Sequence, residues 1–125
     1  MIADDEPLAR ERLKMLLAPD RDMEVVAECR NGSEVLTALK THKIDLLFLD
    51  IRMPGKDGFD VIEEIGLPNM PMTVFVTAHN EYAVEAFEVH ALDYLVKPIE
   101  RKRLGETLAR VKERMRLEEE RGQVN

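Results

Sequence analysis

The segment KIDLLFLDIRMPGKDG (residues 43–58) decides how this chain folds. Residues 44–49 are nearly all apolar, which is typical of a strand buried on both faces of a parallel sheet, and the run stops at one acid, Asp50. A Met-Pro-Gly turn follows at residues 53–55. An Asp after a strand often only caps the next turn, so this segment alone leaves open whether Asp50 is structural or functional.

Length and composition indicate a single globular domain. The chain has 125 residues, 45% hydrophobic and 34% charged, and no apolar segment approaches the roughly 20 residues of a membrane span. We therefore expect no membrane partner. A net charge of -7 argues against nucleic-acid binding by this portion itself. Cys29 is the only cysteine, and no signal peptide precedes the first acids, so a cytoplasmic location is expected.

Strand-like apolar runs alternate with segments of helical period on both sides of residues 43–58. This alternation predicts an α/β fold with a doubly wound five-stranded parallel sheet of order 2-1-3-4-5 and five helices. The predicted strands span residues 1–3, 23–29, 45–50, 72–78 and 93–98. The predicted helices span residues 7–17, 32–42, 58–66, 81–91 and about 101–117.

Both ends of the chain look cut. A central strand of three residues would leave hydrogen-bonding groups of its neighbours unpaired, so we expect apolar residues before Met1 in the parent protein. After Leu117 the sequence is wholly polar up to Gln123. We therefore predict a domain at residues 1–117 with a truncated first strand, and the start of a linker to a missing output domain at residues 118–125.

Polar residues follow the predicted strands at their carboxyl ends, where a parallel sheet binds its ligands. Three close carboxylates repel one another unless a cation is present, and an all-oxygen site suits Mg²⁺ better than Zn²⁺ or Ca²⁺. Mg²⁺ at carboxylates usually partners a phosphoryl group, for which one carboxylate can be the nucleophile. The candidates are Asp4 and Asp5 for the metal, Asp50 as nucleophile, and Thr77 and Lys97 for the phosphoryl oxygens.

Four motifs in this order resemble the receiver domain of bacterial two-component response regulators: DDEP (residues 4–7), LDIRMPGKDG (49–58), VTA (76–78) and LVKP (95–98). The resemblance implies a flavodoxin-like fold and phosphorylation of Asp50 by a sensor histidine kinase. It also implies a self-phosphorylating and self-dephosphorylating switch that is not a metabolic enzyme. Mg²⁺ would bind Asp4, Asp5, Asp50 and the backbone carbonyl of Arg52.

The same resemblance implies three further features of the site. Thr77 and Lys97 would contact the phosphoryl group, Tyr94 would act with Thr77 as the conformational switch, and the Lys97–Pro98 peptide would be cis. The segments PLARERL (7–13) and EYAVEAFEVHALDYLVKP (81–98) further resemble receivers of the LytTR type (LytR/AlgR), whose separate output domain binds DNA.

Helix 81–91 carries apolar residues beyond the stripe that would cover the sheet: Tyr82, Val84, Val89 and Ala91. We therefore expect phosphorylation to strengthen a homodimer through this fourth helix, the fifth strand and the fifth helix.

Two alternative functions compete with the switch. A phosphatase of the haloacid dehalogenase type also places an Asp at a strand end, but it needs a second acid two residues later, where this chain has Arg52. A receiver-like module that takes no phosphate would lack an acid or the lysine. The structural interpretations are that Asp4 and Asp5 cap a helix, that Thr77 is an ordinary strand residue, that Lys97 is a surface lysine and that Tyr94 is a core residue.

Overall fold

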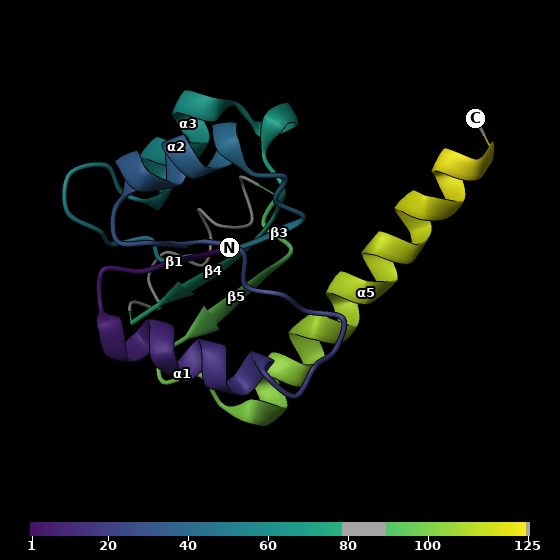
Figure 1. The fold of residues 1–125 in the computed structure, drawn as a ribbon, viewed down its shortest axis with the longest axis horizontal. Helices are drawn as coiled ribbons and strands as arrows, with labels where there is room; N and C mark the ends of the chain where they lie inside the picture. The colour runs from purple at the N-terminus through teal and green to yellow at the C-terminus, as the bar shows by residue number, and fades with distance from the viewer. Residues whose placement is uncertain (79–89, 125) are drawn as a thin grey trace.

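The computed structural model describes residues 1–78 and 90–124. One five-stranded parallel sheet has the order β2-β1-β3-β4-β5, which confirms the predicted α/β fold and strand order. Its strands are β1 (Ile2–Ala3), β2 (Glu28–Cys29), β3 (Leu46–Leu49), β4 (Met72–Thr77) and β5 (Asp93–Val96). Helices cover both faces of the sheet, as a doubly wound fold requires (Figure 1).

The described residues contain four α-helices and one short 3₁₀ helix. They are α1 (Pro7–Leu17), α2 (Gly32–Thr41), α3 (Gly58–Ile65), η1 (Leu67–Asn69) and α5 (Arg101–Val124). The fourth helix was predicted over residues 81–91, of which 81–89 lie outside the described residues; its last two residues, His90 and Ala91, are not helical here.

Local signals explain where the helices begin. Pro7 occupies the first turn of α1. The side chain of Asn31 accepts a hydrogen bond from the Glu34 N–H and so caps α2. Asp57 and Asp60 form a reciprocal capping box at the start of α3. These caps stabilise the helices that follow the loops at the functional end of the sheet.

Two apolar clusters form the core, one on each face of the sheet. Successive side chains of β3 alternate between them, with Leu47 and Leu49 in the cluster under α2 and α3. Leu46 and Phe48 lie in the other cluster, which α1 and α5 cover. This explains why the whole β3 segment is apolar: both of its faces are buried.

The strand predicted over residues 23–29 is shorter than expected. Only Glu28 and Cys29 pair as a strand, because β1 offers just Ile2 and Ala3 as partners. The last helix is longer than expected, since α5 continues through the polar residues after Leu117 to Val124. In Figure 1 its C-terminal half extends away from the sheet and the other helices.

Candidate functional site

The carboxyl ends of the neighbouring strands β1 and β3 bring Asp4 and Asp50 together. Asp50 directly follows β3, and Asp4 directly follows β1. Backbone hydrogen bonds hold both positions in the sheet: the Asp4 N–H donates to the Cys29 carbonyl at 2.9 Å, and the Asp50 N–H donates to the Ala3 carbonyl at 2.8 Å. The two carboxylates are therefore carried by rigid, paired backbone.

The turn after Asp50 packs closely on the strand end. The Gly58 N–H donates to the Ile51 carbonyl at 2.8 Å, and a Cβ atom at Gly58 would lie only 2.9 Å from the Asp50 carbonyl oxygen. Glycine is thus required where α3 begins. Gly55 has a φ of 71°, which glycine adopts without strain. The Arg52 N–H reaches back to the Asp50 carboxylate at 3.2 Å.

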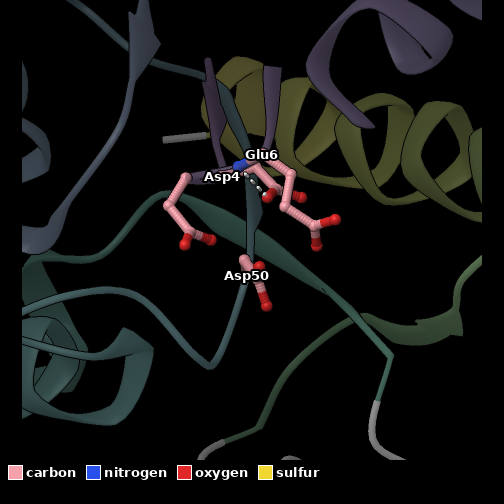
Figure 2. Close-up of side chains that lie close together, drawn as sticks. Asp4, Glu6 and Asp50 are labelled. Atoms are coloured by element: carbon pink, nitrogen blue, oxygen red, sulfur yellow. Dashed lines mark hydrogen bonds between the residues drawn. The ribbon is translucent and has the colours of Figure 1, made fainter. Parts of the chain in front are cut away.

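Four carboxylates form what we call the acidic cluster: Asp4, Asp5, Glu6 and Asp50. Each offers an oxygen, and these oxygens lie within 4.8 Å of one another. Asp4 and Asp50 are buried, whereas Asp5 and Glu6 are exposed. Figure 2 shows Asp4 and Glu6 on the segment after β1, near Asp50 at the end of β3. The structure thus brings together the three predicted metal-binding acids and adds a fourth.

Lys97, which follows β5, supplies positive charge to this cluster. Its ammonium nitrogen lies 2.7 Å from the Asp4 carboxylate, 2.8 Å from that of Glu6 and 3.2 Å from that of Asp50. Burial lowers the pKa of Lys97, but its hydrogen bonds to Asp4 and Glu6 and the charge of Asp50 outweigh burial, so the pKa is raised. Lys97 therefore stays protonated and supplies a positive charge within the site.

The charge of Lys97 does not fully compensate Asp50. Burial, followed by repulsion from Asp4, raises the pKa of Asp50 from 3.8 to about 7, against the opposing effects of Lys97 and the Arg52 N–H. The metal-free site thus has an excess of negative charge. Its donors are carboxylate oxygens, the ligands that Mg²⁺ prefers, and among the described residues no His or Cys belongs to the acidic cluster. The residues fit a hard divalent cation.

The remaining predicted residues lie on β4 and β5. Thr77, the last residue of β4, is fully buried, and its carbonyl accepts a hydrogen bond from the Lys97 N–H at 2.8 Å. Tyr94 is partly buried and packs against the core cluster under α2 and α3. The Lys97–Pro98 peptide bond is cis. Thr77 and Lys97 thus lie at the same end of the sheet as Asp50.

Glu6, the fourth member of the acidic cluster, was not among the residues predicted from the sequence, although one signal was present. Glu6 belongs to the quoted DDEP motif and follows the aspartate pair directly. Its contact with Lys97 joins residues 91 positions apart, so only the folded chain reveals it.

A parallel sheet with an acidic cluster and a lysine at its carboxyl edge is the arrangement that the sequence resemblance to receiver domains implies. Residues 1–109 match the response regulator receiver domain family, and the chain belongs to this family. The match covers every residue of the acidic cluster, Thr77 and Lys97.

Among full-length relatives, the transcriptional regulatory protein BtsR of Salmonella typhi is 49% identical over 113 residues. These residues make up 90% of this chain and 47% of BtsR, so the chain spans about half the length of this relative.

Two solved structures share the fold. The receiver domain of AraT, a response regulator from Geobacillus stearothermophilus, is 39% identical with a TM-score of 0.83, over 94% of this chain and 95% of that one. TrrA from Thermotoga maritima, solved in complex with Mg²⁺ and a beryllium fluoride, is 30% identical with a TM-score of 0.75, over 88% and 95% of the two chains. Within the described residues, no helix has the length and apolar character needed to cross a membrane.

Proposed function

We propose that this receiver domain is a phosphorylation switch in which Asp50 accepts a phosphoryl group. The observation that carries the proposal is the buried Asp50 carboxylate, 3.2 Å from the Lys97 ammonium within a cluster of four acids. One Asp50 oxygen attacks the phosphorus of a phosphohistidine or of acetyl phosphate. The bond from phosphorus to the leaving group breaks, its electron pair stays on the leaving group, and Asp50 becomes an acyl phosphate.

In this proposal the cation is Mg²⁺, held by Asp4, Asp5, Asp50 and the backbone carbonyl of Arg52. When bound, the ion neutralises charge on the acids and on the incoming phosphoryl oxygens. The excess negative charge around Asp50 supports this assignment, because it repels a phosphoryl donor as long as it is uncompensated. The Mg²⁺-containing structure of TrrA supports it by analogy.

The chain's own residues provide the rest of the chemistry. Lys97 donates charged hydrogen bonds to the phosphoryl oxygens, and the Thr77 hydroxyl donates one more. The buried β3 and β4 fix the relative positions of Asp50 and Thr77 through their paired backbones. Reorientation of Thr77 and Tyr94 then transmits the effect of phosphorylation to the exposed edge of the sheet at β5.

Incubation with acetyl phosphate and Mg²⁺, followed by intact-mass measurement, tests the proposal. We expect one phosphoryl adduct on the parent chain, none on Asp50→Asn and none after Mg²⁺ is chelated. Asp45→Asn, which changes an exposed acid just before the same strand, should keep the adduct. An adduct on Asp50→Asn at the parent rate would show that another residue is the nucleophile.

We also propose the partners of this switch. The phosphoryl donor is a sensor histidine kinase, and the output is a DNA-binding domain of the LytTR type. Two observations support the output: BtsR is a transcriptional regulatory protein, and this chain matches about half of its length. The sequence of the parent gene beyond codon 125 tests the output class directly, because a LytTR domain must follow in frame.

Phosphorylation is proposed to strengthen a homodimer through the predicted fourth helix, β5 and α5. On the described part of this face, Val96 at the end of β5 is 42% exposed. Light scattering with Mg²⁺ and beryllofluoride should show a mass increase that Val96→Glu prevents. Leu8→Glu on α1, where the parent side chain is 84% exposed, is the control and should leave the increase intact. A dimer sensitive to Leu8→Glu alone would place the interface on α1.

A further inference from the structure

Within residues 1–78 and 90–124, Lys97 has three carboxylate partners, and they differ in their surroundings. The side chains of Asp4 and Asp50 are 5% and 4% exposed, whereas that of Glu6 is 61% exposed. Lys97 itself is 14% exposed. Glu6 therefore holds the lysine from the solvent side, and the two aspartates hold it from the buried side.

Backbone contacts keep Glu6 at this position. Its N–H donates to the Asp4 carboxylate at 2.9 Å, drawn as a dashed line in Figure 2. Its carbonyl accepts hydrogen bonds from the N–H groups of Ala9 and Arg10 at 3.1 and 3.2 Å, at the first turn of α1. Glu6 is thus the N-cap residue of α1, although its side chain makes no capping bond. That carboxylate is directed to Lys97 instead.

The three partners respond differently when the switch is loaded. A cation bound by Asp4, Asp5 and Asp50 draws on the two buried carboxylates that contact Lys97. Of the three carboxylates that contact Lys97 in the described part of the chain, Glu6 alone lies outside this proposed ligand set. An ammonium group has three N–H donors and no acceptor, so its hydrogen bonds shift toward the anions that remain available. Glu6 and a phosphoryl group on Asp50 then compete for the same lysine.

We propose that Glu6 is a positioning residue that holds Lys97 before phosphorylation and competes with the phosphoryl group for it. This inference rests on the proposed function, because it assumes that Lys97 moves to phosphoryl oxygens. Glu6 thereby favours the unphosphorylated state. The effect is modest, since an exposed ion pair changes an equilibrium by roughly two- to fivefold.

The test measures the binding of Mg²⁺ and of beryllofluoride separately by titration calorimetry. Glu6→Gln is compared with the parent chain and with Glu11→Gln. Glu11 is a matched control, because it is also an exposed glutamate near the start of the chain paired with a lysine, Lys14 at 3.0 Å. For Glu6→Gln we expect about two- to fivefold tighter beryllofluoride binding at saturating Mg²⁺ and less than threefold change in Mg²⁺ affinity. Glu11→Gln should match the parent in both.

A second readout needs no metal. In ¹H–¹⁵N spectra of the lysine ammonium groups, Lys97 is identified by the signal that Lys97→Arg removes. Its hydrogen bond to Glu6 slows proton exchange, so Glu6→Gln should broaden or shift this signal, while Glu11→Gln should leave it unchanged. A structural role of Glu6 as a helix cap would not move the Lys97 signal.

The outcomes separate failure of this inference from failure of the proposed function. If the parent chain binds no beryllofluoride with Mg²⁺, the proposed function is wrong. If the parent binds it and Glu6→Gln binds equally or more weakly, Glu6 does not compete for Lys97 and the inference is overturned. A loss of Mg²⁺ affinity of about tenfold or more in Glu6→Gln would make Glu6 a metal ligand instead and would also overturn it.

Discussion

At the scale of single residues, the site is defined by an imbalance of charge. Among the described residues, four carboxylates form the acidic cluster and three of them contact Lys97; the two aspartates among these three are buried. Buried charges without full compensation lower stability, whereas the same charges prepare a site for a divalent cation and a phosphoryl group. The residues that carry the proposed function are therefore expected to lower the unfolding free energy of the domain when no metal or phosphoryl group is bound. Two substitutions measure this effect.

Asp50→Asn should stabilise the metal-free domain. The pKa of Asp50 is raised to about 7 in the folded state, so its ionisation destabilises the fold as the pH rises from about 4 through about 7. The amide keeps the shape and removes the charge. We expect a gain of about 1–2 kcal/mol in unfolding free energy at pH 8, and little gain at pH 4. Urea unfolding in EDTA at both pH values measures it. Equal gains at the two pH values would show that charge is not the cause.

Lys97→Met should have the opposite effect. Removing the ammonium leaves Asp4 and Asp50 buried beside each other without the cation that contacts both of them, and breaking a buried ion pair in this way costs about 3 kcal/mol. Mg²⁺ should restore more stability to this variant than to the parent, because the ion replaces the lost positive charge. Urea unfolding in EDTA and in saturating Mg²⁺ gives both values. A Mg²⁺ effect no larger than in the parent would contradict this explanation.

At the scale of secondary-structure elements, α5 is attached to β5 by a second charged network. The buried Asp93 carboxylate accepts hydrogen bonds from Arg103 at 2.7 and 2.9 Å and from the Thr107 hydroxyl at 2.7 Å. Arg110 lies 3.0 Å from it, and Arg103 also reaches the Tyr94 carbonyl at 3.3 Å. The strand that carries Tyr94 is thereby joined to three turns of the last helix.

Asp93→Asn should weaken this attachment in a pH-dependent way. Burial raises the pKa of Asp93, but hydrogen bonds from Arg103, Thr107 and the Tyr94 N–H outweigh burial and lower it to about 2. Because the folded pKa lies below the ordinary value of 3.8, the ionised group stabilises the fold above that pH, and the contribution is lost as the pH falls toward 2.

We therefore expect Asp93→Asn to lose about 2 kcal/mol of unfolding free energy at pH 7, with the difference from the parent shrinking toward pH 2. Urea unfolding across this pH range measures the loss. Asp22→Asn is the control, since Asp22 contacts the same helix through Lys112 at 3.3 Å but has a 74% exposed side chain. A loss at Asp93 that stays constant with pH would contradict the role of its charge.

At the scale of the whole molecule, the strand order brings the loops after β1, β3 and β5 to one edge of the sheet. β1 and β3 are neighbours in the sheet although 42 residues separate Ala3 from Leu46, and β4 and β5 follow in order beside them. The loops after β1 and β3 therefore meet, and Lys97 after β5 reaches across to them. The site exists only when the whole sheet is assembled.

The predicted domain boundary at Leu117 can be tested by truncation. Val111 is fully buried, whereas Leu117 is 37% exposed, and residues 118–123 contain no apolar side chain. Ending the chain after Leu117 should change the unfolding free energy by less than about 0.5 kcal/mol, because it removes mainly exposed ion pairs such as Arg116–Glu120.

Ending the chain after Arg110, by contrast, removes Val111 and the partly buried Met115 and should cost about 2 kcal/mol or more. Urea unfolding of the two truncated chains compares them. A large loss in the longer one would extend the domain to residues 118–124.

The sequence by itself determined the fold class, the strand order and the edge of the sheet that carries the site. Residues 44–49 predicted a strand buried on both faces, and Asp50 marked its end, because apolar period and strand-end position are properties of the local sequence. The helix over residues 7–17 was predicted with the bounds that the structure shows. Asp4, Asp5 and Asp50 were named as neighbours by the rule that parallel strands end at one edge, and they do lie together.

Only the tertiary structure decided which charges contact each other. The pairing of Glu6 with Lys97 and the network around Asp93 depend on how α1 and α5 pack against the sheet, and no local pattern encodes distances between side chains so far apart in sequence. The length of β2 likewise depends on its partner strand. Ile2 and Ala3 of β1 pair with Glu28 and Cys29, and residues 23–26 have no β1 residue opposite them. Ion pairs depend on which side chains the fold brings together, and strand lengths depend on the partner strand that is available. Both therefore became known only from the tertiary structure.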